Sequence, residues 1–217
     1  MPPFARLDSA AVGGDAGRSF AFVEPCGEIV AHALDEVVPA VRAVEAAVAR
    51  GEHAAGYVAY EAAPAFALGL ATRAPAAGLP LLWFGVFARR VAVDPVTAAA
   101  PDVGESAIGA VGPLAASVSE DEYRAALAEL IDEIASGDLQ QVNHTFRLRA
   151  SWMGDEGALY RALLAAQRPG YGAWLRLPRF SILSASPELF FRRRGEAIEL
   201  RPMKGTRARG RWSEEDR

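Results

Sequence analysis

The sequence predicts an α+β fold, in which helices accompany antiparallel β-strands. Three observations carry this prediction. Apolar residues recur at spacings of three and four in separate stretches, a pattern typical of amphipathic helices. Short β-rich runs bounded by Gly or Pro indicate strands between and after these helices. The last two runs are separated only by Arg194-Gly195-Glu196, which favours an antiparallel hairpin.

The composition is that of a folded protein, because 51% of the 217 residues are apolar and 23% are charged. A net charge of −4 argues against nucleic-acid or anionic-lipid partners. The lone Cys26 cannot form an internal disulfide, which suits a reducing cytoplasm. The N-terminus lacks the apolar run of a secretory signal, and Glu61 and Pro64 interrupt the most apolar region. We therefore expect a cytoplasmic protein with no membrane partner.

The first part of the chain should contain two strands with a helix between them. The strands are expected at residues 20–23 and 56–60 and the helix at residues 37–50, with Pro39 tolerated in its first turn and Gly51 as its stop. The apolar stripe of this helix comprises Val37, Val41, Val44 and Val48. One face of the helix should therefore be buried.

A third strand, at residues 81–93, is apolar enough to lie in a sheet that is buried on both faces. Residues 94–116 are rich in Ala, Gly, Pro and Val without helical or strand periodicity, and indicate a loop or linker. These features predict a boundary near residue 115, which divides the chain into regions 1–115 and 116–217.

The second region should begin with a helix at residues 120–135, because Ser119 and Glu122 form a capping box and Gly137 follows as a stop. Its apolar stripe comprises Tyr123, Leu127, Leu130, Ile131 and Ile134. Alternation predicts a strand at residues 141–150, and another helix should occupy residues 155–167. The remaining strands are expected at residues 171–177, 180–185, 189–193 and 197–201.

Lys204 lies in Arg201-Pro202-Met203-Lys204-Gly205-Thr206, where Gly205 permits close approach of a ligand. Only a neutral amine is nucleophilic, and Arg201 and Arg207 would disfavour its protonated form if they lie close in space. A solvated lysine on a Pro/Gly turn explains the same pattern. The residues alone leave both interpretations open.

Two further positions are candidates for ligand chemistry. Glu188 precedes an apolar run, where a partly desolvated carboxyl group could act as a general acid, or it is an ordinary carboxylate at a strand edge. Gln141 begins the polar face of its predicted strand, which either offers hydrogen bonds to a ligand or is simply solvated. No Cys/His spacing is typical of a zinc site.

Three segments in this order resemble the chorismate-binding enzymes, a family that includes anthranilate, isochorismate and aminodeoxychorismate synthases. The segments are Gly137 to Asn143, Ser184 to Phe190 and Arg201 to Gly210. Residues 55–64 and 81–85 also look like the N-terminal region of the aminodeoxychorismate-forming members. The resemblance implies an antiparallel-sheet α/β sandwich of the anthranilate synthase component I type, of which this chain would be an incomplete, N-terminal portion.

The resemblance also implies roles for individual residues. In the aminodeoxychorismate-forming members a lysine attacks C2 of chorismate at the position of Lys204, where anthranilate synthases typically carry Ala. Glu188 would protonate the departing C4 hydroxyl, and Gly205, Thr206 and Gln141 would contact the substrate. Members that form isochorismate need a lysine at the position of Gln141, so the sequence argues against hydroxyl transfer.

A cofactor and a partner are implied in the same way. Family members hold Mg²⁺ through glutamates, the first of which follows a motif that matches Ser213 to Arg217, so no metal ligand is expected within the chain. Ammonia would come from a glutamine amidotransferase subunit or domain. The expected activity is amination of chorismate to 4-amino-4-deoxychorismate in p-aminobenzoate and folate synthesis. The alternatives are an anthranilate synthase component and an inactive, truncated binding or scaffold fragment.

Overall fold

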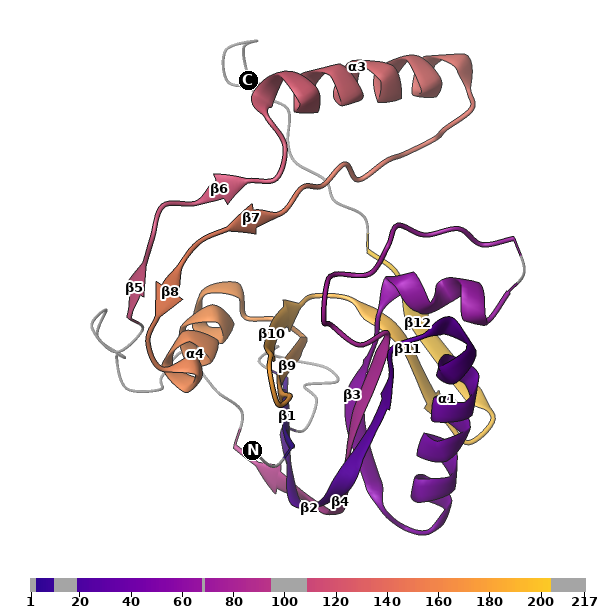
Figure 1. Ribbon diagram of the computed structural model, residues 1–217, viewed down its shortest axis with the longest axis vertical. Coiled ribbons are helices and arrows are strands. Elements are labelled where there is room, and N and C mark those ends of the chain that lie inside the picture. The colour runs from indigo at the N-terminus through magenta and orange to yellow at the C-terminus, as the bar shows by residue number, and fades with distance from the viewer. Residues whose placement is uncertain (1–2, 10–18, 68, 95–108, 204–217) are drawn as a thin grey trace. The chain divides into compact units, whose positions relative to one another are not determined.

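The computed structural model describes residues 3–9, 19–67, 69–94 and 109–203, and it has mixed helices and antiparallel sheets (Figure 1). The α+β prediction is therefore confirmed. The chain forms two compact units. The first comprises Met1–Asp102 and Tyr160–Arg201, and the second comprises Val103–Leu159 and Pro202–Arg217.

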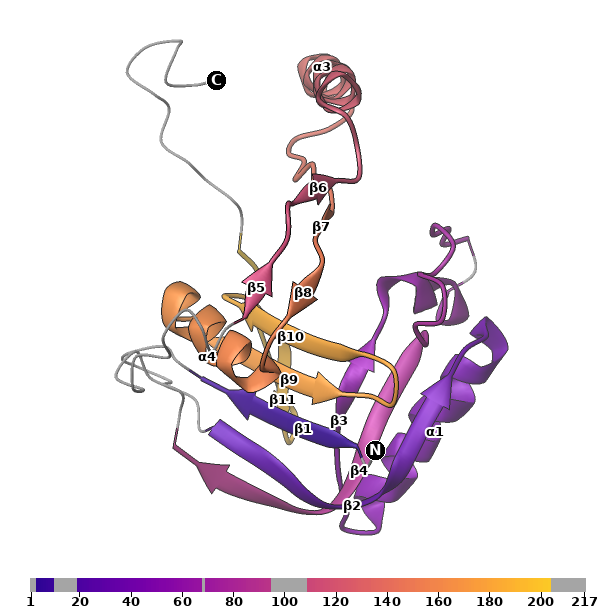
Figure 2. The ribbon, with the colours of Figure 1, turned by 60° about the vertical axis from the view of Figure 1, so that its left-hand side comes forward.

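A six-stranded sheet dominates the first unit, and all of its neighbouring strands are antiparallel (Figure 2). Its strands are β1 (Phe4–Asp8), β2 (Ser19–Ala31), β3 (His53–Val58), β4 (Leu82–Val93), β9 (Tyr171–Arg176) and β10 (Ser181–Ser186). The order across the sheet is β10-β9-β1-β2-β4-β3. The sheet therefore takes strands from both sides of residue 115, and the division into regions 1–115 and 116–217 stays a prediction.

Strand β2 is much longer than the predicted run at residues 20–23. Its pairing with β4 shifts between Pro25 and Gly27, and this bulge lets the strand continue past two residues that usually end strands. Strand β3 ends at Val58 instead of residue 60, and a 3₁₀ helix, η1 (Tyr60–Ala65), follows it. In β4, the expected burial on both faces holds only up to Phe87.

Helix α1 (Leu34–Ala49) begins three residues before the predicted start at Val37, so Pro39 lies beyond the first turn. Pro39 is exposed, so water can solvate the carbonyl group that lacks its usual N–H partner. The stripe is also rotated relative to the prediction, because Val48 is 52% exposed. The fully buried residues of the helix are Val37, Ala40 and Ala47. Two of these are alanines, and small side chains allow a helix to approach a sheet closely.

Two hydrophobic clusters stabilise the first unit. One gathers Phe22, Trp83 and Phe87 with Leu175 and smaller residues from the same sheet. The other gathers side chains of α1, η1 and the adjoining strands around Val37 and Leu82. Burial of such apolar side chains contributes about 1.5–3 kcal/mol each relative to exposure. The second cluster holds α1 against β2 and β4, and α1 also lies beside β3, as Figure 2 shows.

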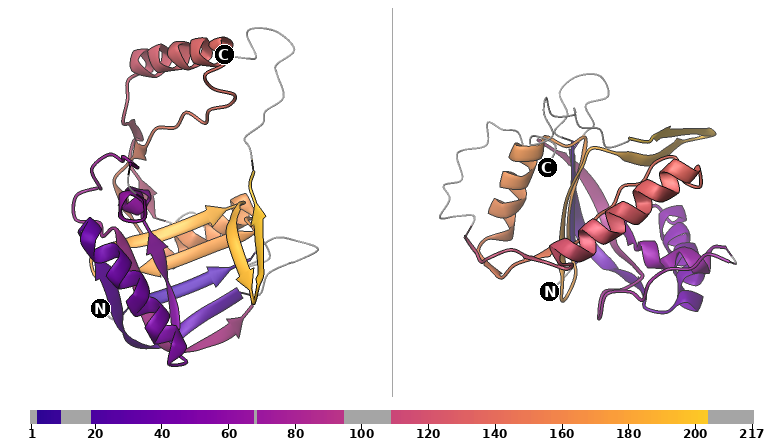
Figure 3. Two further views of the ribbon diagram at one scale, coloured as in Figure 1. Left: turned by 90° about the vertical axis from the view of Figure 1, so that its right-hand side faces the viewer. Right: turned by 90° about the horizontal axis from the view of Figure 1, so that it is seen from above.

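The predicted helix near residues 155–167 is α4 (Glu156–Gln167), and Asp155 Oδ1 accepts a hydrogen bond from Ala158 N at its start. The predicted hairpin is also confirmed. Strands β11 (Leu189–Arg194) and β12 (Ala197–Arg201) pair through a two-residue turn, and Gly195 has φ 60° as the first turn residue. Figure 3 shows this hairpin as a ribbon outside the six-stranded sheet.

The second unit contains helix α3 (Glu120–Ser136), which begins at the predicted residue and ends one residue later than predicted. Ser119 Oγ accepts from Glu122 N, the Glu122 carboxylate accepts from Ser119 N, and Gly137 ends the helix with φ 89°. None of its residues is buried, so the predicted apolar stripe is not covered in the described chain. Leu127, Ile131 and Ile134 are 39%, 56% and 43% exposed.

The predicted strand at residues 141–150 is wrong for most of its length. Only β7 (Leu148–Arg149) is a strand, and it pairs with β6 (Ala115–Ala116). A neighbouring bridge joins β8 (Trp152–Met153) to β5 (Ala110–Val111). Alternation alone does not form a strand, because backbone groups need a paired partner and the apolar face needs a core. Here the apolar residues Val142, Phe146 and Leu148 are exposed.

Candidate functional site

Glu188 lies between β10 and β11 in the first unit, at the position that the sequence predicts for the start of an apolar strand. Its side chain is exposed, and so are Phe190 and Phe191 beside it, at 82% and 56%. The partial burial that the sequence suggests for this carboxyl group is therefore absent from the described residues. The role of Glu188 as a general acid stays a prediction.

Two hydrogen bonds from one side chain hold the backbone of Glu188. Ser186 Oγ accepts a hydrogen bond from Glu188 N at 3.1 Å and donates to Glu188 O at 3.3 Å. Leu189, the next residue, is 8% exposed. The Glu188 carboxylate thus projects from a peptide segment that is fixed on both sides.

Gln141 belongs to the second unit and is exposed in a segment without regular structure. The polar strand face on which it was expected is therefore not formed. Nearby, the His144 ring lies against the Tyr123 ring with centroids 5.0 Å apart, and Phe146 meets Tyr123 edge-on at 5.5 Å. These aromatic contacts join the irregular segment to α3.

Lys204, Gly205 and Thr206 lie outside the described residues. Their neighbour Arg201 ends β12 and forms an ion pair with Glu199 at 2.5 Å, and Arg192 of β11 approaches the same carboxylate at 3.6 Å. Of these two contacts, only the one from Arg192 crosses between the strands of the hairpin.

No group of three or more His, Cys, Asp or Glu side chains in the described ranges is close enough to hold a metal ion. Within the same ranges, no helix combines the length and apolarity needed to cross a bilayer.

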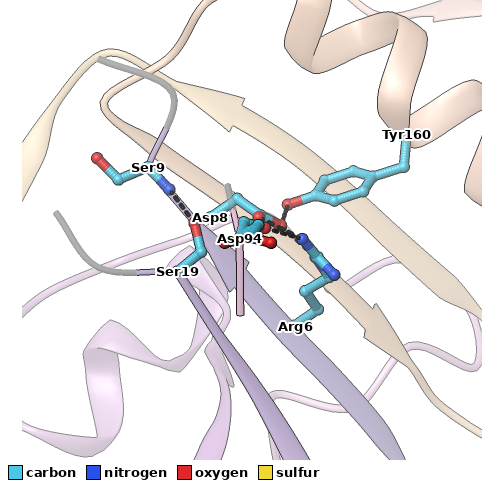
Figure 4. Close-up of polar contacts among 6 residues, drawn as sticks. All are labelled: Arg6, Asp8, Ser9, Ser19, Asp94 and Tyr160. Atoms are coloured by element: carbon cyan, nitrogen blue, oxygen red, sulfur yellow. Dashed lines mark hydrogen bonds and ion pairs between the residues drawn. The ribbon is translucent and has the colours of Figure 1, made fainter. Parts of the chain in front are cut away.

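A buried polar network, which the sequence did not predict, connects the sheet to α4 (Figure 4). Arg6 binds the Asp8 carboxylate through Nε and Nη2 at 2.7 and 2.9 Å, and Arg6 Nη2 also donates to Asp94 O. Tyr160 donates its hydroxyl group to Asp8 Oδ2 at 3.0 Å. The Asp8 side chain is 0% exposed and Tyr160 is 1% exposed. The carboxylate is therefore paired with a cation and with a neutral donor.

Burial and nearby charges shift the pKa values of Tyr160 and Arg6 in this network. Burial of the Tyr160 hydroxyl group, and then the negative charge of Asp8, raise the pKa of Tyr160 far above its usual value. The hydrogen bond to Asp8 raises the pKa of Arg6. Breaking a buried ion pair by removing one partner typically costs about 3–5 kcal/mol, because the other charge stays buried. The network therefore stabilises the packing of α4 against β1.

A cavity of about 190 Å³ is another feature that the sequence did not indicate. It lies between β2, β4 and the turn that joins β9 to β10. Trp83 Nε1 donates to Glu28 Oε2 at 2.7 Å in its wall. The other side chains that line it include Val30, His32, Leu177, Arg179 and Phe180. Its shape arises from turns far apart in the sequence, which a local pattern cannot predict.

Comparison with known proteins relates the chain to two kinds of synthase. The chain is 38% identical to aminodeoxychorismate synthase component 1 of Bacillus subtilis over 105 residues, which is 48% of the chain and 22% of that protein. The counterpart from Klebsiella aerogenes is 38% identical over 101 residues, 46% of the chain and 22% of that protein.

Anthranilate synthase component 1 of Thermus thermophilus is 35% identical over 117 residues, which is 54% of the chain and 25% of that protein. The chain thus matches only about a quarter or less of the length of these relatives. The profile of the family described as chorismate binding enzyme matches residues 105–217, more than half of the chain. The protein therefore belongs to the family of chorismate binding enzymes.

Proposed function

We propose that this chain is the N-terminal part of an aminodeoxychorismate synthase component I. The complete enzyme would convert chorismate and ammonia to 4-amino-4-deoxychorismate in p-aminobenzoate and folate synthesis. The observation that carries the proposal is Lys204, because anthranilate synthases typically have Ala at this position. The similarity to the Bacillus and Klebsiella aminodeoxychorismate synthases supports it.

The chemistry begins with the neutral Lys204 amine, which attacks C2 of chorismate. The ring double bonds shift, the C4–O bond breaks, and Glu188 gives its proton to the departing hydroxyl group, which leaves as water. Ammonia then attacks C4, the double bonds shift back, and the C2–N bond to Lys204 breaks. The Lys204 amine leaves neutral, and the excess proton of the new C4 ammonium group returns to Glu188. The ring then carries an amino group at C4 in place of the hydroxyl group.

The fixed backbone of Glu188 suits the role of a general acid, but its exposed side chain would have to be covered. Its backbone is fixed by Ser186, which favours a constant position for the carboxyl group. Its side chain is exposed, and a general acid works best when neighbours keep it protonated near neutral pH. We propose that substrate and further parts of the enzyme cover Glu188 during the reaction. Gln141, Gly205 and Thr206 are proposed to contact the substrate.

Mg²⁺ and an ammonia source complete the proposal. The described residues do not form a metal site, so we propose that any Mg²⁺ ligands come from other parts of the enzyme. A glutamine amidotransferase subunit or domain would supply ammonia. The enzyme would act in the cytoplasm.

Anthranilate synthase component I is the second candidate, because the Thermus anthranilate synthase component is 35% identical to this chain. Product analysis separates the two. The complete enzyme that contains this chain is incubated with chorismate, Mg²⁺ and ammonium ions, and the products are resolved by chromatography. We expect 4-amino-4-deoxychorismate. Formation of anthranilate and pyruvate would overturn the proposal.

An inactive binding or scaffold protein is a third candidate, favoured by the large exposed side chains of the described residues. The same incubation addresses it when chorismate consumption is measured. Failure to consume chorismate, together with stable binding of an amidotransferase, would favour the scaffold. Turnover to the aminated product excludes it.

A further inference from the structure

The turn at Ser186-Pro187-Glu188 joins the six-stranded sheet to the hairpin. Strand β10 ends at Ser186, which pairs with Tyr171 of β9, and β11 begins at Leu189. The chain therefore passes from one sheet to another within two residues. Glu188 stands at this junction, where small changes of backbone torsion would move its side chain by a large amount.

One hydroxyl group closes the turn. Ser186 Oγ accepts from Glu188 N at 3.1 Å and donates to Glu188 O at 3.3 Å, so both polar backbone groups of Glu188 bond to the same side chain. Pro187, between them, has a ring that fixes its own φ. The torsions on both sides of the Glu188 α-carbon are thereby restricted, and with them the direction of its side chain.

The hydroxyl group that closes the turn is itself well anchored. The register of β10 on β9 is continuous from Ser181 to Ser186, and β9 in turn pairs with β1 along its length. On the other side of Glu188, Leu189 is 8% exposed and resists displacement. The sheet therefore fixes the position of Ser186, and the hydrogen bonds of Ser186 fix the Glu188 backbone.

We propose that Ser186 is the positioning residue for the general acid Glu188. The inference rests on the proposed function for the role of Glu188, and on the two hydrogen bonds for the role of Ser186. Ser186 need not touch the substrate. It holds the carboxyl group beside the position of the leaving hydroxyl group of chorismate. The entropy cost of orienting the acid is then met before the reaction begins.

The activity test uses the complete enzyme with chorismate and ammonium ions. Ser186→Ala should lower kcat by about 10- to 100-fold with KM nearly unchanged, since misplacement of a catalytic group by about 1 Å can cost 100-fold. Ser186→Thr keeps a hydroxyl group on the β-carbon and should restore most of kcat. Ser184→Ala removes a hydroxyl group from the same strand and is the matched control.

The pH profile distinguishes positioning from a change in the carboxyl group itself. Ser186 bonds the backbone of Glu188, so Ser186→Ala should lower the plateau of kcat and leave the midpoint of its pH dependence in place. Equal losses in the Ala and Thr variants, or an unchanged kcat in Ser186→Ala, would overturn the inference.

Hydrogen exchange gives a readout that does not depend on the reaction. A hydrogen bond of about 1 kcal/mol corresponds to about a 5-fold change in an opening equilibrium. The Glu188 amide should therefore exchange about 5-fold faster in Ser186→Ala, while the amides of β10 keep their rates. Unchanged exchange at Glu188 refutes the inference whatever the enzyme produces. An anthranilate product would refute the proposed function and leave this result standing.

Discussion

The Tyr160 hydroxyl group donates to Asp8 Oδ2 at 3.0 Å, across 152 positions of the sequence. This bond fastens α4 to the strand at the centre of the six-stranded sheet, and Arg6 neutralises the same carboxylate. Both oxygen atoms of a buried carboxylate are therefore satisfied, which is the condition under which a buried charge is tolerated.

Tyr160→Phe should lower the free energy of unfolding by about 1–3 kcal/mol, because a buried acceptor loses a donor while the ring packing is kept. Urea titration followed by tryptophan fluorescence measures the loss, and the Trp174 ring lies 5.7 Å from that of Tyr160. Tyr171→Phe, which removes a hydroxyl group from a partly exposed tyrosine, is the control. Equal midpoints for the two variants would contradict the prediction.

Gly172 of β9 makes room for this network. A β-carbon at Gly172 would lie 2.8 Å from Leu164 Cδ2 and 3.0 Å from the Tyr160 hydroxyl oxygen. Gly172→Ala should therefore cost about 1–3 kcal/mol of unfolding free energy through overpacking. Gly27→Ala, where nothing lies within 4 Å, serves as the control. Combined with Tyr160→Phe, Gly172→Ala should cost less than the sum of the single changes, because the clash is partly relieved.

The stability of the fold should fall at alkaline pH. Burial raises the pKa of Tyr57 to about 12, and the pKa of Tyr160 is also raised from the ordinary value of 10.0. The fold favours the neutral phenols, so their contribution is complete below pH 10 and is lost as pH rises through the folded-state values. Unfolding free energies measured from pH 9 upwards should decline less steeply in Tyr57→Phe and Tyr160→Phe. Identical slopes would exclude these two groups as the cause.

Lys204→Ala in the complete enzyme should abolish amination of chorismate, because a methyl group cannot attack C2. Lys204→Arg should fail as well, since a guanidinium group stays protonated. Formation of 4-amino-4-deoxychorismate is followed by chromatography, and thermal unfolding of each variant serves as the folding control. Aminodeoxychorismate production at the wild-type rate would remove Lys204 from the mechanism.

The isolated 217-residue chain should associate with itself and have poor solubility. In the hairpin, Phe190, Ile198 and Leu200 are 82%, 63% and 62% exposed, and unpaired strand edges accompany apolar surface of this kind. Sedimentation over a range of concentrations measures association. Phe190→Ser should reduce it more than Phe66→Ser, a change at an exposed residue outside the hairpin. A monodisperse chain with a cooperative thermal transition would contradict the prediction.

Elements encoded by neighbouring residues could be predicted from the sequence. Ser119 and Glu122 fix the start of α3 because a capping box needs only a few residues, and Gly195 marks the hairpin turn for the same reason. The exposed stripe of α3 shows the limit of this reasoning. An amphipathic pattern indicates that a face should be covered, but it does not name what covers it.

Elements that depend on distant partners could not be predicted in this way. Strand β1 is short and contains charged residues, so it has no strong local signal until β2 and β9 flank it. The segment at residues 141–150 is the opposite case, with clear alternation but strand pairing at only two of its residues. For the candidate site, family resemblance identifies the roles of Glu188 and Lys204, whereas the bonds from Ser186 appear only in three dimensions.

The strand order has a consequence for how the chain folds during synthesis. Strand β1 pairs with β2 soon after both are made, but its other edge must wait for β9, which begins only at Tyr171. At about 5–20 residues per second, that edge stays open for roughly ten seconds or more. The nascent protein is therefore exposed to wrong pairing at this edge until β9 is made, and chaperone binding in this interval would favour the native sheet.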